Sequence, residues 1–179
     1  MSPRFCLPLV RGRGAGFGNE LIPWARAAVA GYVLGARILT PAFGLNPRNY
    51  RLYFNTPRFD WLGHRLLEYA LPRFEFTEAD FLEHGGELLS DAIRSYASRH
   101  RLRERTTWVL TTQGMWGGYR HIFEARDFVR SRLYLSNYTA ANLAIIKSRL
   151  DPKRITVGMH VRLGDFQSAP QLEVYKGRF

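Results

Sequence analysis

The sequence predicts an α/β fold with a Rossmann-like, mostly parallel sheet and flanking helices. Short apolar runs typical of strands alternate along the chain with longer segments of helical periodicity. Two of the expected strands run directly into glycine-rich turns that precede helices. The chain has 179 residues, of which 46% are hydrophobic, and this is enough for one packed domain or slightly more.

The amino-terminal part predicts a strand, a glycine-rich turn, a helix and a second strand. Residues 4–10 form a short apolar run, in which Pro8 favours an edge position or a frayed end. Helical spacing begins after the turn, with Asn19 as the expected N-cap and Pro23 expected within the first helical turn. The second strand is expected over residues 36–40.

The middle of the chain predicts a long surface loop followed by more helices and strands. Residues 43–59 show no clear period, and such a long loop is either a candidate acceptor surface or a simple covering of the protein surface. The last expected helix has an apolar side that should be buried. Expected helices cover residues 60–71, 78–83, 88–102, 122–135 and 137–150, and expected strands cover residues 73–76 and 106–112. The apolar side of the last helix consists of Ala141, Leu143, Ala144, Ile145 and Ile146.

The final expected strand carries the strongest chemical signal. Residues alternate over 155–162, so His160 and Arg162 share one face at the carboxyl end of the strand. In open α/β sheets, ligands bind at that end. An imidazole, a guanidinium and the N–H groups of the turn at 163–166 suit an anionic oxygen, above all a phosphate. The structural alternative is a salt bridge between Arg162 and Asp165 beside a core histidine.

Two glycine-rich turns are the other candidates for binding. The first, residues 11–18, has its glycines at the wrong spacing for a dinucleotide fingerprint in every register, and the chain has no Walker pattern. A glycine loop at a helix amino terminus is still an anion-binding candidate, with tight packing as the alternative explanation. In the second turn, residues 113–119, Trp116 or Tyr119 would either stack on a sugar or base or pack the loop.

Two segments resemble conserved motifs of the superfamily of α1,2-, α1,6- and protein O-fucosyltransferases. Residues 157–166 are similar to the His-x-Arg-x-Gly-Asp motif followed by an aromatic residue, and residues 14–21 are similar to the Gly-x-x-Gly-Asn-Gln segment that opens those enzymes. The two matches occur in the family order and at roughly the family spacing.

The resemblance implies a two-lobed GT-B-type glycosyltransferase in which a GDP-sugar, expected to be GDP-fucose, binds between facing Rossmann-like lobes without a metal. Residues 1–152 would form the amino-terminal, acceptor-side lobe. Residues 153–179 would form the first strand and the phosphate-binding motif of a donor-binding lobe that is largely absent from this chain. The chain is therefore expected to be a fragment. Pairing with another polypeptide and loss of transferase activity are the alternatives.

The implied reaction transfers the sugar with inversion to a hydroxyl of a glycan or another acceptor. Arg162 is the expected catalytic residue, because a fixed guanidinium stabilises the charge that builds on the leaving diphosphate. No general base is assigned, and departures from the family pattern at Gly16, Glu20 and Leu163 leave the donor sugar open. The expected donor- and phosphate-binding residues are His160, Gly164, Asp165, Phe17, Gly18 and Asn19.

The formal net charge of +11 supports an alternative function, a basic nucleic-acid-binding α/β domain without catalysis. The densest basic run is residues 99–105, for which a solvated surface is the other explanation. The remaining cations are spread along the chain, and a basic surface also suits nucleotide-sugars and acceptors at a membrane surface. Stable binding of nucleic acid is therefore not expected, whereas peripheral membrane association is compatible with the sequence.

The cysteine content and the hydropathy of the chain indicate the expected cellular location. Cys6 is the single cysteine, so neither a disulfide framework nor a zinc cluster is expected. The amino terminus has no hydrophobic signal region, and no apolar run reaches membrane-spanning length. The expected location is cytoplasmic.

Overall fold

The computed structural model describes residues 3–9, 16–41, 48, 50–54, 60–85, 88–132, 135–151 and 153, without the side chains of residues 51 and 60–62. The expected last strand and the motif at 157–166 lie outside the described residues. So do the first part of the amino-terminal glycine-rich turn and most of the loop at 43–59.

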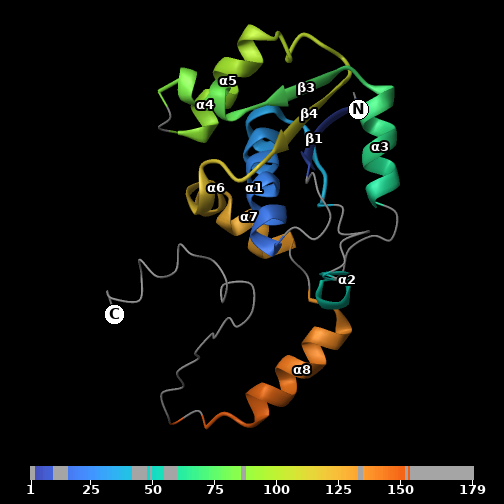
Figure 1. The fold of residues 1–179 in the computed structure, drawn as a ribbon, viewed down its shortest axis with the longest axis vertical. Coiled ribbons are helices and arrows are strands. Elements are labelled where there is room, and N and C mark those ends of the chain that lie inside the picture. The colour runs from blue at the N-terminus through green and yellow to red at the C-terminus, as the bar shows by residue number, and fades with distance from the viewer. Residues whose placement is uncertain are drawn as a thin grey trace, which may run out of the picture. The chain divides into compact units, whose positions relative to one another are not determined.

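A four-stranded, all-parallel sheet forms the centre of the described fold, with the strand order β2-β1-β4-β3 (Figure 1). Leu9 pairs with Gln113 and Phe76 pairs with Thr112, so the carboxyl ends of β1, β4 and β3 lie at one edge of the sheet. The strands are β1 (Arg4–Leu9), β2 (Arg37–Ile38), β3 (Arg73–Phe76) and β4 (Trp108–Gln113). This arrangement confirms the predicted α/β, Rossmann-like fold class.

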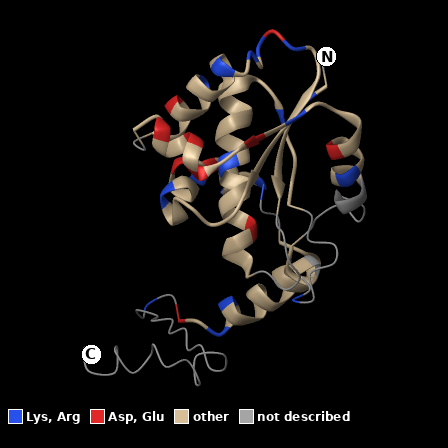
Figure 2. Ribbon diagram, turned by 45° about the horizontal axis from the view of Figure 1, so that its top comes forward, with Lys and Arg blue, Asp and Glu red and all other residues tan. Residues whose placement is uncertain are grey.

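Helices cover both faces of the sheet. Helix α1 packs on β1 and β4 and contacts α5, α6 and α7, whereas α3 lies on the other side of the strands (Figures 1 and 2). The helices are α1 (Phe17–Leu34), α2 (Tyr50–Tyr53), α3 (Asp60–Ala70), α4 (Glu78–Glu83), α5 (Leu89–Arg99), α6 (Gly118–Glu124), α7 (Arg126–Arg132) and α8 (Asn137–Ser148). Among the described residues, no helix has the length and apolar character that a bilayer span needs.

The main core lies between the sheet and the layer of α1 and α5. Trp24, Trp108, Phe76, Leu110 and Ile93 are all at most 2% exposed and belong to one apolar cluster. Because α1 is buried along most of its length, it is the helix about which the other elements pack. The amino-terminal end of α1 is thereby held firmly next to the carboxyl edge of the sheet.

The start of α1 differs from the sequence prediction. The N-cap is Gly16, in an extended conformation (φ −64°, ψ 157°), so the expectation that Asn19 caps the helix is wrong. Asn19 lies in the first turn and donates its N–H to the Gly16 carbonyl at 2.9 Å. Phe17 is the first residue of the helix, and its ring stacks on Phe54 at 4.6 Å between centroids. Pro23 consequently lies in the second turn.

Two strand predictions also need correction. β1 is a central strand, so the edge position expected from Pro8 is wrong. The proline is tolerated because β2 pairs only with Phe5 and Cys6 and ends before Pro8 would need a donor on that side. β2 itself spans two residues where five were expected, and the helix expected over 122–135 is divided into α6 and α7 at Ala125.

The chain divides into two compact units, Met1–Asn142 and Leu143–Phe179, and α8 crosses the boundary between them. No residue of α8 is buried, and Leu143, Ile145 and Ile146 are 37%, 51% and 56% exposed. The predicted burial of the apolar side of α8, which also includes Ala141 and Ala144, is therefore wrong for the described structure, where no strand or other helix of its unit covers that side. The lobe boundary predicted at residue 152 stays a prediction.

Candidate functional site

The carboxyl edge of the sheet, next to β1 and β4, is the candidate site. The connection through α1 leads from β1 to β2 on one side, whereas β3 and β4 lie on the other side of β1. The carboxyl ends of β1 and β4 lie side by side at this edge, and ligands of open α/β sheets bind outside the carboxyl ends of the strands. Two segments follow these strand ends: the beginning of α1 and the turn between β4 and α6.

The beginning of α1 presents two glycines to this edge. A Cβ atom added at Gly16 or Gly18 would meet no atom within 4 Å, and neither residue has a positive φ. Tight packing among the described residues therefore does not account for these glycines. Their absent side chains leave open space beside the first turn of an 18-residue helix, and the dipole of such a helix favours an anion at this end.

The predicted donor-binding residues Phe17, Gly18 and Asn19 are adjacent in the first turn of α1. The Phe17 ring lies between Tyr50, at 5.3 Å, and Phe54, at 4.6 Å, so it anchors the helix start to α2 and the residue that follows it. A ligand role for these three residues stays a prediction. His160, Arg162, Gly164 and Asp165, the other predicted site residues, lie outside the described residues.

A buried arginine supports the turn between β4 and α6. Arg26 of α1 is 0% exposed, and its Cζ lies 3.9 Å from the Trp116 ring centroid. Its Nη1 donates to the carbonyl of Trp116 at 2.5 Å, and its Nη2 donates to the carbonyls of Gln113 and Gly114 at 2.7 and 2.5 Å. We call these acceptors the three turn carbonyls. Burial lowers the pKa of Arg26 to about 9, and the negative charge of Glu78 partly offsets this effect. Because this pKa lies above 7, the guanidinium is cationic at neutral pH.

His121 of α6 lies directly under this turn and is 0% exposed. Its ring meets the rings of Trp116 and Phe81 edge-on, each at 5.1 Å between centroids, and neither ring nitrogen has a hydrogen-bond partner among the described residues. Burial, with the charges of Arg26 and Arg120, lowers the pKa of His121 to about 4. The imidazole is therefore neutral at pH 7.

The two aromatic residues of the second turn have different environments. Trp116 packs against Arg26 and His121 and donates its Nε1–H to the Gln113 carbonyl at 3.0 Å, so it packs the loop rather than standing free for a ligand. Tyr119 is 79% exposed, and the stacking role suggested for it stays a prediction. The Gln113 side chain points to β3, where its Nε2 donates to Glu75.

Arg26 and His121 are the two residues of this site that the sequence reading missed. The available signal was a single arginine, Arg26, inside the otherwise apolar run of α1 at residues 21–30. The side chain of a charged residue in such a run must either extend to solvent or form hydrogen bonds with buried acceptors. For Arg26 the buried acceptors are the three turn carbonyls.

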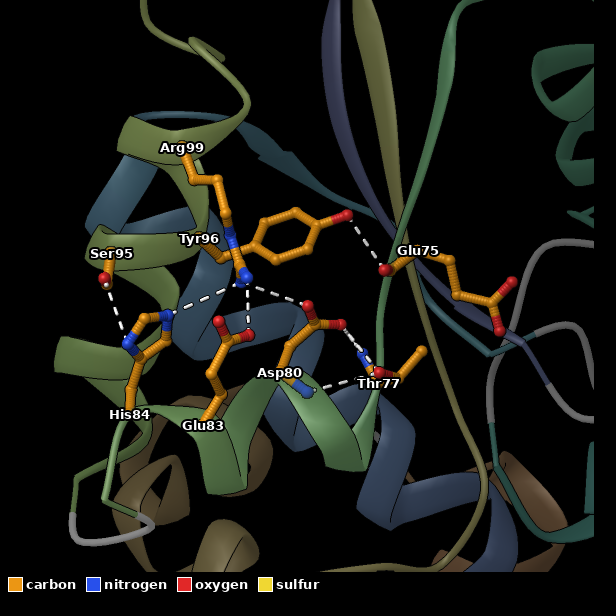
Figure 3. Close-up of polar contacts among 8 residues, drawn as sticks. All are labelled: Glu75, Thr77, Asp80, Glu83, His84, Ser95, Tyr96 and Arg99. Atoms are coloured by element: carbon orange, nitrogen blue, oxygen red, sulfur yellow. Dashed lines mark hydrogen bonds and ion pairs between the residues drawn. The ribbon is translucent and has the colours of Figure 1, made fainter.

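Two of the four arginines in the basic run at 99–105, Arg99 and Arg105, have side chains engaged with the rest of the protein. Arg99 lies 3.1 Å from Asp80 and 2.5 Å from Glu83, and its guanidinium stands over the Tyr96 ring (Figure 3). The charged residues of α4 are all acidic, whereas α5 carries both acidic and basic residues (Figure 2). Arg105 covers the Phe74 ring and donates to a backbone carbonyl. These contacts reduce the support for a nucleic-acid-binding stripe along the run.

Within the described part of the chain, no group of three or more histidine, cysteine, aspartate or glutamate residues is placed to hold a metal ion. No family model matches the chain, and neither the curated proteins nor the solved structures contain a match to it.

Proposed function

We propose that the chain contains the acceptor-side lobe of a fucosyltransferase-like glycosyltransferase. In this proposal it binds a GDP-sugar, expected to be GDP-fucose, and the sugar is transferred with inversion to a hydroxyl of a glycan or another acceptor. The observation that carries the proposal is the position of α1, a long buried helix that begins beside the carboxyl edge of the sheet with two glycines that packing against the described residues does not require.

The helix start would contact the diphosphate of the donor. The positive end of the helix dipole favours an anion there, and Gly18 has no side chain to keep a ligand away from the backbone. The motif that includes Arg162 would supply the guanidinium that stabilises the leaving diphosphate as the bond to the anomeric carbon breaks. His160 would orient the diphosphate, and Asp165 would hold Arg162 or its turn.

Thermal denaturation with GDP tests the proposal. At a GDP concentration about 100-fold above the Kd, binding stabilises a protein by about 2.7 kcal/mol. For a domain of this size the expected rise in Tm is roughly 5–10 °C. We expect the rise in the unmodified chain and in the charge-matched control Arg149→Ala, which changes an exposed arginine. In Arg162→Ala we expect the rise to be lost.

A second pair of variants tests the helix start of α1 and leaves the motif at 157–166 unchanged. Gly18→Val puts a branched side chain in front of the first N–H groups, whereas Gly63→Val makes the same change in α3, at a glycine that also has open space around it. We expect only Gly18→Val to weaken GDP binding. Equal GDP responses in all four variants, or none in the unmodified chain, would contradict the proposal. Salt-steep DNA binding that Arg162→Ala leaves unchanged would instead support the nucleic-acid alternative.

A further inference from the structure

We propose that the amino edge of the sheet binds the surface of an anionic lipid bilayer through a cluster of arginines. The cluster, which we call the amino-edge patch, consists of Arg4 at the start of β1 and of Arg101, Arg103 and Arg105 in the loop between α5 and β4. It lies at the opposite edge of the sheet from the candidate site. The inference goes beyond the proposed function, because it requires neither a GDP-sugar nor the motif at 157–166.

The loop between α5 and β4 is fastened to the start of β1. The register sets Arg4 opposite Trp108, so the loop and the first residue of β1 meet at the end of the sheet where the chain begins (Figure 1). The guanidinium of Arg4 donates to the Arg105 carbonyl from Nε at 3.0 Å and from Nη2 at 2.7 Å. Its Nη2 also donates to the Arg103 carbonyl at 3.1 Å. The four arginines of the patch therefore come together at this edge, and the three of the loop are exposed.

The positive charge of the patch is not neutralised by the part of the chain that the structure describes. None of its four arginines forms an ion pair with a described residue. Arg105 stands over the Phe74 ring, 5.0 Å from its centroid, and donates to the His100 carbonyl. Residues 101–107 contain one acidic residue, Glu104, so four arginines and one glutamate leave a net charge of +3. Such an excess of one sign attracts a surface of the opposite sign.

Arg101 has a backbone conformation that favours glycine. Its φ is +51°, and among the described residues it is the one residue other than glycine with a positive φ. The N–H of Leu102 donates to the Ala97 carbonyl at 2.9 Å, and the N–H of Arg101 donates to the Ser98 carbonyl at 3.1 Å. This pair of bonds ends a helix on a left-handed residue that is usually glycine, so an arginine there costs stability. Because its exposed side chain forms no ion pair with a described residue, an anionic partner outside the fold accounts for this cation.

Exposed apolar side chains near the patch favour a bilayer over a nucleic acid. Tyr69 and Leu66, in the last two turns of α3, are 84% and 61% exposed. Helix α3 leads into β3 at the amino edge, where the N–H of Val109 in β4 donates to the Pro72 carbonyl at 3.0 Å. Tyrosine is enriched where lipid headgroups meet water, and arginines near an anionic leaflet strengthen binding to it. A nucleic-acid backbone would engage the arginines alone, whereas a bilayer also takes up the tyrosine and the leucine.

Co-sedimentation of the chain with lipid vesicles tests the inference. The vesicles consist of phosphatidylcholine alone or of phosphatidylcholine with about 30% phosphatidylserine, an anionic lipid. We expect binding to the vesicles that contain phosphatidylserine, no binding to the neutral ones, and weaker binding as the salt concentration rises. Absence of binding, or equal binding to both kinds of vesicle, would overturn the inference.

Charge variants show whether the patch or the net charge is responsible. The double variant Arg101→Gln with Arg103→Gln removes two exposed cations from the patch, and the matched control, Arg130→Gln with Arg132→Gln, removes two exposed cations from α7. At roughly fivefold per arginine, we expect the first pair to weaken vesicle binding about 25-fold and the control to change it little. An equal loss in both double variants would refute a local patch.

Arg101→Gly separates the charge from the fold. Glycine adopts a positive φ without strain, so we expect the Tm to rise by roughly 2–4 °C. We expect vesicle binding to weaken about fivefold in the same variant. A higher Tm with unchanged vesicle binding would contradict the role given to this arginine.

Two tyrosine variants distinguish a bilayer from a nucleic acid. Tyr69→Ser removes the exposed ring near the patch, and Tyr119→Ser removes a ring that is 79% exposed in α6, beyond the carboxyl edge of the sheet. We expect only Tyr69→Ser to weaken vesicle binding several-fold, and neither variant to change binding of duplex DNA measured by fluorescence anisotropy. If Tyr69→Ser binds vesicles as the unmodified chain does, while loss of Arg101 and Arg103 abolishes DNA binding, the patch is a nucleic-acid contact and the inference fails.

Discussion

Buried His121 predicts a loss of stability in mild acid. In the folded chain its pKa is about 4, whereas an unfolded histidine has a pKa of 6.5. The unfolded state therefore binds the proton first as the pH falls, so stability is complete above about pH 6.5 and declines as the pH falls from 6.5 toward 4. From these two pKa values the loss contributed by His121 reaches about 2 kcal/mol at pH 5 and about 3 kcal/mol below pH 4.

Urea denaturation between pH 7.5 and pH 5 measures this loss before most carboxylates titrate. A loss of 2 kcal/mol lowers the denaturation midpoint by about 1 M urea for a typical m-value. In His121→Phe, which keeps an aromatic ring against Trp116 and Phe81, we expect about 2 kcal/mol less dependence on pH over that range. His64 is the necessary control, because burial also lowers its pKa to about 4 and it contributes in the same window. The same decline with pH in His121→Phe and in the unmodified chain would refute the reasoning.

Two further substitutions probe contacts of α1. Gly31→Ala should lower the free energy of unfolding by about 1–3 kcal/mol in urea titrations, because the new Cβ would collide with the Ile38 side chain on β2. Unchanged or increased stability would contradict this and show that Ile38 and β2 move to accommodate the methyl group. Thr112→Val removes the buried hydrogen bond from Oγ1 to the Pro23 carbonyl, 2.7 Å long, at nearly constant volume. We expect it to cost about 1–2 kcal/mol, and a midpoint unchanged within error would contradict that value.

The strand–helix–strand unit at the amino terminus could be predicted because its elements are encoded locally, by apolar runs and by the helical spacing after the glycine turn. Boundaries that depend on distant partners could not. The helix starts at Phe17, whose ring contacts the distant residues Tyr50 and Phe54, and the central position of β1 depends on its pairing with β4. Pro8 suggested an edge because the sequence does not reveal that β2 is too short to reach it.

The candidate site was predictable in part for the same reason. A glycine turn after a strand marks a binding edge from sequence alone, and both such turns follow strands that lie side by side. The support beneath the second turn was not predictable, because Arg26 meets carbonyls of residues 113–116, about 90 positions later in the chain. Likewise, the run at 99–105 looks free in the sequence, whereas Arg99 is held by two carboxylates of α4.

The pairing of β1 with β4 has a consequence for how the chain must assemble. Arg4 lies opposite Trp108, and its guanidinium donates to the Arg105 carbonyl, 101 positions away, at 2.7 Å. During synthesis, the first strand therefore leaves the ribosome long before its main partner exists. The centre of the sheet cannot close until residue 113 has emerged, so folding is governed by long-range contacts and is slow for a chain of this length.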